Sequence, residues 1–263
     1  MTRGEGAADG RLDVRLDGHV AVVTLDRPEK RNALTLPMVA ALREVTARLQ
    51  AESAVRVVVL TGAGDKAFCA GGDLRTMIPV ALDAGRDTLN PDPTERFLSG
   101  ITKPVVAAVR GACFGAGLEL LLGTDLRVAG SDARFGLPEA ALGMIPGDGT
   151  HIRLPQQVPM AVAKSMLLRG EVLDAQRAVE VGLVNEVAAP EDVLDVAMSI
   201  AAELAAKGPI ALQTSKEIVT RTTESAADFA LEHALNGRVL SSQDAREGVA
   251  AFLEKRDPQF RGH

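Results

Sequence analysis

The sequence predicts an α/β fold with parallel strands, followed by a helical carboxyl-terminal third. Two segments, beginning at residues 55 and 104, each pass from a short apolar run into a glycine-rich turn. Repeated units of strand, glycine turn and helix are typical of parallel sheets. From Pro159 onward the pattern is helix after helix, and no Gly/Ser-rich linker interrupts it. We therefore expect one domain with a helical tail.

The first elements are a β-hairpin and an amphipathic helix. Residues 12–26 alternate apolar and polar side chains around Asp17-Gly18, a strong signal for a tight hairpin turn. Thr35 then precedes a helical apolar pattern over 36–52, with a proline in the first turn. A threonine at this position is a good helix N-cap.

The middle of the chain supplies the core strands. Residues 75–100 contain three prolines and mixed charge, which indicates a mobile loop or short helices. Around this stretch we expect strands at 55–60, 104–109, 125–130 and 133–136, a helix at 117–123, and a long helix at 190–209.

Composition narrows the function. The 263 residues carry a net charge of −6 and no Trp or Tyr, which argues against a nucleic-acid or anionic membrane partner. Two cysteines cannot build a disulfide framework and suit a reducing cytoplasm. Charges interrupt every apolar run before it reaches membrane-spanning length. Residues 1–11 lack the apolar stretch of a signal peptide, and we expect them to form a short flexible tail.

Glu119 is the only charged residue between Gly111 and Thr124. In a helix it would share its face with Gly115, Ala116, Leu122 and Gly123, all small or apolar. A solvated helix face would need polar neighbours there. A carboxylate buried in such a setting is costly unless it is protonated or paired, so Glu119 is a candidate functional residue.

Several other chemistries have little support. The glycine turns match neither G-x-G-x-x-G nor the P-loop, and no G-x-S-x-G nucleophile elbow occurs. Cys69 and Cys113 have no histidine nearby in sequence, and the His and Cys residues lack metal-ligand spacing. We expect both cysteines to be small core residues.

A second carboxylate and two glycine turns remain. Glu139 also lies between apolar neighbours, and two carboxylates in an apolar site can act as acid and base. Glycine turns that enter helices present free N–H groups. Two such turns could direct two N–H groups at one oxygen and stabilise charge on a carbonyl. These features favour chemistry beside an activated carbonyl.

The sequence resembles the crotonase, or enoyl-CoA hydratase/isomerase, superfamily over nearly its whole length. The resemblance is carried, in order, by LDRPEKRNAL, AFCAGGDL, KPVVAAVRGACFGAGLEL, ARFGLPEAALGMIPG, GLVNEV and AFLEKRDPQF. It implies a spiral of β-β-α units over 12–200 and a helical region at 201–263 that makes homotrimers or dimers of trimers. It further implies an acyl-CoA thioester substrate, with neither a metal nor a redox cofactor, since CoA belongs to the substrate.

The resemblance also assigns roles to residues. Glu119 and Glu139 correspond to the two catalytic glutamates of the hydratases, and Gly147 to a glycine whose N–H helps to hold the water. The N–H groups of Ala70 and Ala116 would form the oxyanion hole. Residues expected to contact substrate or CoA are Lys30, Arg31, Ala70, Gly71, Gly72, Asp73, Leu74, Phe252 and Lys255.

The chain departs from the family pattern after Gly147. Many relatives continue with A-G-G-T-Q, whereas this chain has Asp148-Gly149-Thr150-His151. The extra carboxylate and histidine are either harmless neighbours of the site or marks of a polar or otherwise unusual acyl substrate. We expect an enoyl-CoA hydratase. The alternatives are a Δ3,Δ2-enoyl-CoA isomerase, a specialised acyl-CoA dehydratase, or an RNA-binding relative, which the acidic balance disfavours.

Overall fold

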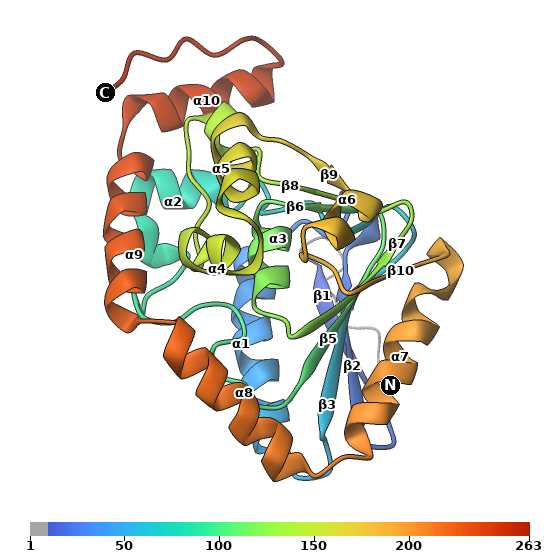
Figure 1. Ribbon diagram of the computed structural model, residues 1–263. Helices are drawn as coiled ribbons and strands as arrows, with labels where there is room; N and C mark the ends of the chain where they lie inside the picture. Colours follow the sequence, from blue (N-terminus) through green and yellow to red (C-terminus); the bar gives the residue numbers. More distant parts are fainter. Residues whose placement is uncertain (1–9) are drawn as a thin grey trace.

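The computed structural model describes residues 10–263 and contains two sheets (Figure 1). The larger sheet has the strand order β1-β2-β3-β5-β7-β10, in which β1 and β2 are antiparallel and the other neighbours are parallel. Its strands are β1 (Arg11–Asp17), β2 (Val20–Asp26), β3 (Val57–Gly62), β5 (Val105–Val109), β7 (Leu126–Gly130) and β10 (Glu186–Ala188). The predicted hairpin is confirmed, but its turn lies at Gly18-His19, one residue later than expected, because Asp17 still pairs with Val20.

A second, smaller sheet has the order β4-β6-β8-β9. Its strands are β4 (Ala67–Cys69), β6 (Ala112–Phe114), β8 (Arg134–Gly136) and β9 (Leu173–Asp174). The pairs β3 and β4, β5 and β6, and β7 and β8 each place one strand in the larger sheet and the next in the smaller one. The predicted α/β class and its repeating units are therefore confirmed.

The larger sheet is covered on both faces, which explains its continuous apolar strands. Val57 and Val59 pack with the alanines of α7 (Val193–Ala205), while Val58 and Leu60 face the core that contains α1 (Leu36–Ala51). Thr35 caps α1 as expected, accepting from the N–H of Met38. The expected boundary at residues 200/201 falls inside α7, which runs unbroken to Ala205 along the sheet.

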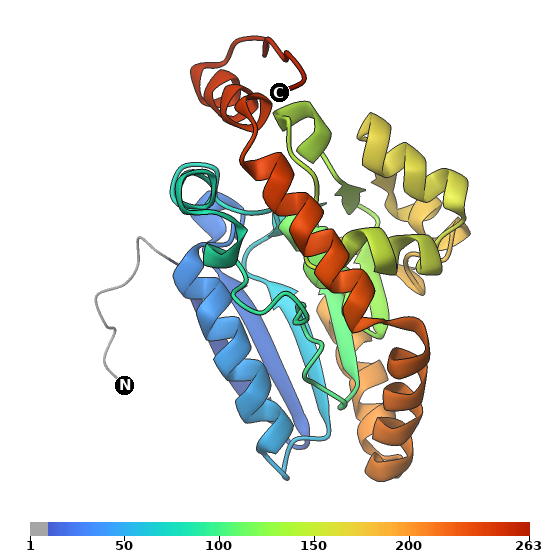
Figure 2. The same ribbon diagram turned by 90° about the vertical axis from the view of Figure 1, so that its left-hand side faces the viewer.

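Most of the remaining helices lie in the second half of the chain. Within the stretch at 75–100, where a mobile loop or short helices were expected, the chain forms α2 (Ile78–Ala84) and the short helix η2 (Arg86–Thr88). Figure 2 shows α9 (Ala226–Leu240) running diagonally across the molecule, and it packs against both η2 and α4 (Thr150–Gln157). Besides α7, α4 and α9, the helices of this half are η3 (Glu139–Leu142), α5 (Met160–Arg169), α6 (Ala175–Glu180), η4 (Pro190–Asp192), α8 (Pro209–Thr223) and α10 (Gln243–Glu254).

The first strand begins at the last residue of the expected amino-terminal tail. The tail expected at 1–11 lies mostly outside the described residues, and β1 already begins at Arg11. Among residues 10–263, no helix combines the length and the apolar character needed to cross a bilayer.

Candidate active site

Glu119 lies in α3 (Ala116–Leu122), a helix whose residues from Gly117 onward are all buried. Its Oε1 accepts a hydrogen bond of 2.7 Å from the backbone N–H of Gly147. The glutamate is 7% exposed, so the carboxylate singled out in the sequence does not lie on a solvated helix face. A loop that is distant in sequence holds it in place.

Glu139 begins the short helix η3 and lines the same cavity as Glu119. Its Oε2 is buried and has no hydrogen-bond partner among the described residues. The Cα of Gly115 lies so close that a Cβ there would come within 2.7 Å of Glu139 Oε1. Glycine at position 115, with φ of 52°, therefore makes room for the carboxyl.

The surroundings make both carboxyls hard to ionise. Burial raises the pKa of Glu119 well above its ordinary value, and the charges of Asp148 and Glu139 raise it further. The positive charge of Arg86 and the hydrogen bond from the Gly147 N–H lower it, but by less. Burial also raises the pKa of Glu139, to about 7. A hydrogen bond from the residue's own backbone N–H and the charge of His151 lower this pKa, but by less. Near neutral pH such a pair can hold a proton and offer both an acid and a base.

Two chain segments meet beside the glutamates. A Cβ on Gly71 would lie 3.8 Å from the N atom of Ala116, so the Gly71-Gly72 turn approaches the start of α3 closely. The N–H of Ala116 donates to none of the described residues, as expected for the first residue of a helix. It therefore remains available to a ligand.

The expectation for Ala70 does not fit the hydrogen bonds of this turn. The N–H of Ala70 donates to the carbonyl oxygen of Arg31 at 3.0 Å, so it cannot also point at a ligand. Gly72 lines the cavity, and its own N–H has no acceptor among the described residues. Gly71, with φ of 111°, interrupts the extended backbone between Ala70 and Gly72. The N–H that remains free for a ligand is therefore that of Gly72, two residues after the expected Ala70.

The cavity that joins these groups has a volume of about 120 Å³. It is bounded by the Ala70–Leu74 turn, the start of α3, η3, the turn at 144–148 and one side of α9. The predicted substrate contacts Ala70, Gly71, Gly72 and Leu74 all line it. Apart from the two glutamates, the charged residues on its wall are Arg86 and Asp148, whose Nη2 and Oδ2 atoms are 3.3 Å apart.

Helix α9 fixes the turn that carries Gly147. Glu232 accepts hydrogen bonds from the backbone N–H groups of Gly149 (2.6 Å) and His151 (2.9 Å), at the start of α4. Its Oε1 also lies 3.0 Å from His151 Nδ1. Asn236 donates to the carbonyl oxygens of Ile145 and Pro146. His151, one of the two unusual residues after Gly147, thus has a structural partner, whereas Asp148 faces the cavity.

Comparison with known proteins shows the family to which the chain belongs. The sequence profile of the enoyl-CoA hydratase/isomerase family matches residues 15–263. The chain belongs to this family. Its family members include the short-chain-enoyl-CoA hydratase of Clostridium acetobutylicum, which is 37% identical over 91% of this chain and 93% of that protein. The (E)-benzylidenesuccinyl-CoA hydratase of Thauera aromatica is 36% identical, over 95% of this chain and 99% of its own length.

Solved structures of enoyl-CoA hydratase/isomerase relatives share the fold. A carnitinyl-CoA dehydratase from Mycobacterium avium superposes with a TM-score of 0.84 at 34% identity, covering 96% of this chain and 99% of that one. EchA1_1 from Mycobacterium paratuberculosis gives a TM-score of 0.85 at 35% identity, covering 96% and 98%. The crotonase-like fold that the resemblance implied is therefore confirmed.

Five of the residues that the family resemblance assigned to substrate or CoA lie outside the cavity wall. Lys30 and Arg31 are exposed, although the Arg31 carbonyl binds Ala70. Phe252 is 56% exposed on α10, and Lys255 is exposed where α10 ends. The carboxylate of Asp73 instead anchors the turn. It accepts a 2.6 Å hydrogen bond from the Arg27 guanidinium and further hydrogen bonds from the backbone N–H groups of Arg75 and Thr76.

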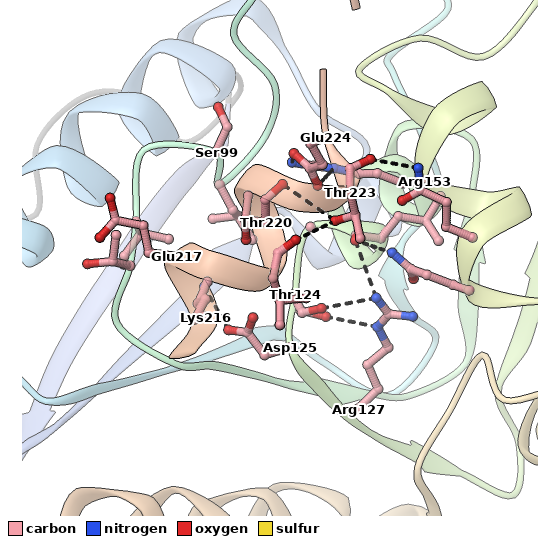
Figure 3. Close-up of a pocket in the computed structure, with 18 of the residues that line it drawn as sticks. Ser99, Thr124, Asp125, Arg127, Arg153, Lys216, Glu217, Thr220, Thr223 and Glu224 are labelled. Atoms are coloured by element: carbon pink, nitrogen blue, oxygen red, sulfur yellow. Dashed lines mark hydrogen bonds and ion pairs between the residues drawn. The ribbon is translucent and has the colours of Figure 1, made fainter. Parts of the chain in front are cut away.

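A larger cavity of about 490 Å³ lies between α8 and the end of α3, away from the glutamates (Figure 3). Two cations on its wall are already paired: buried Arg153 with Glu224, and half-buried Lys216 with Asp125. These two pairs hold α8 and its carboxyl-terminal end to the core. Buried Arg127 donates to the carbonyl oxygens of Leu122, Thr124 and Leu183 and to the Thr124 hydroxyl. Because these cations are already bound within the protein, the smaller cavity remains the better candidate for an enoyl-CoA hydratase/isomerase active site.

Proposed function

We propose that the protein is an enoyl-CoA hydratase that adds water reversibly, in syn geometry, across the trans-2 double bond of an acyl-CoA thioester. The observation that carries this proposal is the pair of enclosed carboxyls, Glu119 and Glu139, in one cavity with the free N–H of Ala116. Two carboxyls can position a water and move its protons, while an isomerase needs only one base.

The N–H groups of Gly72 and Ala116 form the oxyanion hole in this proposal. They polarise the thioester carbonyl, so that the enolate charge that develops on its oxygen is stabilised. Gly72 takes the place that the family resemblance gave to Ala70, because the Ala70 N–H is already bonded to Arg31. Both glutamates then face the carbons adjacent to that carbonyl.

Glu119 and Glu139 hold one water between them. Glu119 takes a proton from the water as its oxygen bonds to C3, and Glu139 delivers a proton to C2. The Gly147 N–H supports this assignment, because it stabilises the ionised form of Glu119. Glu139 has no such donor at Oε2, and its pKa of about 7 lets it carry a proton. A protonated Glu139 would also remove one of the charges that oppose ionisation of Glu119.

The CoA portion would leave the cavity toward charged surface residues. Lys30 and Arg31 lie next to the Ala70 turn and are candidates for its phosphates, with Lys255 and Phe252 as candidates from α10. Exposed apolar side chains on α8, namely Ile210, Ile218 and Val219, support assembly into a trimer or dimer of trimers. Cys69 and Cys113, which are buried and not joined in a disulfide, are consistent with a cytoplasmic protein.

A panel of trans-2-enoyl-CoAs from C4 to C16 tests the proposal. Hydration is followed as loss of the absorbance of the conjugated thioester, beside isomerisation of 3-hexenoyl-CoA. We expect turnover of at least one chain length, faster than isomerisation. Isomerisation without hydration at any chain length would contradict the proposal and favour the isomerase.

A further inference from the structure

The cavity wall beside Glu119 carries a buried ion pair. The side chains of Arg86 and Asp148 are only 8% and 10% exposed. Most of the remaining side chains around them are apolar: Met77, Ile78, Leu89, Phe97, Met144, Ile145 and Leu240. A purely hydrocarbon acyl group would exclude water from this pair without replacing its hydrogen bonds, which is costly.

The pair has hydrogen-bonding capacity to spare. Arg86 can donate five hydrogen bonds, but among the described residues its side chain has one acceptor, Asp148 Oδ2 at 3.3 Å. Its Nε is buried and has no described partner. Asp148 accepts from no other described group. Together the two side chains present donors and an acceptor side by side.

The position of the ion pair determines which part of the acyl chain could contact it. The Arg86 guanidinium packs directly on Gly147, where a side chain would collide with it. The Gly147 N–H holds the catalytic candidate Glu119. A group bound by the pair would therefore lie close to the reacting carbons rather than at the end of a long chain.

The charges in the cavity restrict the chemistry of the group that the ion pair could bind. The carboxylate of Asp148 matches the single positive charge of Arg86, and the same cavity contains the carboxyls of Glu119 and Glu139. A further anion would gain no net attraction there. A hydroxyl group is neutral, and it can donate to Asp148 while accepting from Arg86.

We infer that Arg86 and Asp148 form a subsite for a hydroxyl group carried on the acyl chain next to the reacting double bond. This inference rests on the proposed hydratase function and names its substrate class. Asp148 adopts φ of 50°, a conformation that glycine would adopt at lower cost, so the carboxylate is kept here against its backbone preference.

Three matched substrates test the subsite: 4-hydroxybut-2-enoyl-CoA, pent-2-enoyl-CoA, in which a methyl replaces the hydroxyl, and 4-carboxybut-2-enoyl-CoA. The kcat/KM ratio of the hydroxyl to the methyl substrate is compared between the natural protein and the double variant Arg86→Met with Asp148→Gly. Removing both charges avoids leaving one buried and unpaired. Comparing ratios cancels the intrinsic reactivity of each substrate.

We expect this ratio to be at least about tenfold higher in the natural protein than in the double variant, because unpaired polar groups reject an analogue that lacks the hydroxyl. Asp148→Asn, which keeps the shape, leaves Arg86 with a net charge and should shift preference toward the carboxyl substrate. Arg246→Met, which removes an exposed partner of Asp83 outside the cavity, should leave the ratio unchanged.

The same hydroxyl-to-methyl ratio in the natural protein and the double variant would overturn the subsite. A preference of the natural protein for the carboxyl substrate over the hydroxyl one would overturn the choice of a neutral group. Hydration of all three substrates without discrimination would defeat this inference alone. Failure to hydrate any enoyl-CoA, these three and the C4 to C16 panel included, would instead defeat the proposed function.

Discussion

The backbone N–H of Gly147 donates a 2.7 Å hydrogen bond to Oε1 of Glu119, across 28 positions of the chain. This contact ties a carboxylate on a buried helix to a turn that is itself held by α9 through Glu232 and Asn236. The carboxyl-terminal helices therefore complete the site rather than merely following the core.

Removing the charge of Glu232 should destabilise the protein. Glu232→Gln weakens hydrogen bonds to two backbone N–H groups at the start of α4, and we expect a loss of about 1–3 kcal/mol in the free energy of unfolding. Denaturant titration measures it. Glu203→Gln, which breaks an exposed pair with Lys207, is the control and should change little.

The effect of Glu232 should depend on pH. Hydrogen bonds from His151 and Gly149 outweigh burial and hold the pKa of Glu232 below its ordinary 4.5. A carboxyl with a lowered folded-state pKa stabilises the fold above the unfolded value, and this contribution disappears as the pH falls through the folded value. The difference in the free energy of unfolding between the natural protein and Glu232→Gln should thus be full at pH 7 and shrink below about pH 4.5. A difference that grows on acidification would contradict this account.

The oxyanion hole can be tested at Gly72. Gly72→Pro removes the N–H and should lower kcat about 10²–10³-fold. Gly72→Ala keeps the N–H, and its Cβ would meet Met77 Sδ at 3.4 Å, an ordinary contact, so it should cost far less. Thermal unfolding verifies that both variants fold. Equal activity of the two variants would remove Gly72 from the mechanism.

Hydration should decline as the pH rises above neutral. Burial raises the pKa of Glu139 to about 7, and the proposed mechanism needs this carboxyl to carry a proton. Above this value Glu139 ionises and the pair loses its acid, so kcat/KM should fall about tenfold per pH unit. In acid, protonation of Glu119, whose pKa is also raised, removes the base and activity should fall again. A flat profile between about pH 6 and about pH 9 would argue against Glu139 as the acid.

Assembly should depend on α8, which has no buried residue in the isolated chain. Ile218 and Val219 are 58% and 61% exposed, and we expect them to be covered by another copy of the chain. Light scattering should show a trimer or its multiple, and Val219→Glu should shift it toward smaller species. A natural protein that is monomeric at micromolar concentration would exclude this interface.

The sequence predicted the parts of the molecule that local patterns determine. Buried strands, the existence of the first hairpin and the enclosed Glu119 all follow from periodicity and from residues three or four positions apart. The N–H of Gly72 could not be found in this way, because the φ of 111° at Gly71 interrupts the alternation of the chain. Counting along the motif gave Ala70 instead.

The residues supplied by distant segments were also missed. Arg86 lies in a stretch without a recognisable motif, and Glu232 and Asn236 reach the site through the packing of α9. The buried side of α9 mixes Phe229 and Leu240 with these two polar residues, so it leaves no clear hydrophobic stripe in the sequence. Asp148 could be flagged from sequence, but its partner could not.

Glu119 is the residue on which the proposed hydration depends most directly, and a paired activity measurement on Glu119→Gln tests its role. Glutamine keeps the shape of the side chain and can still accept the Gly147 hydrogen bond, but it cannot take a proton from water. On each folded variant, crotonyl-CoA hydration and 3-hexenoyl-CoA isomerisation are measured together. We predict that Glu119→Gln loses hydration by several orders of magnitude while any isomerisation falls much less, and that Glu139→Gln loses both. Near-normal hydration by Glu119→Gln would contradict the hydratase assignment.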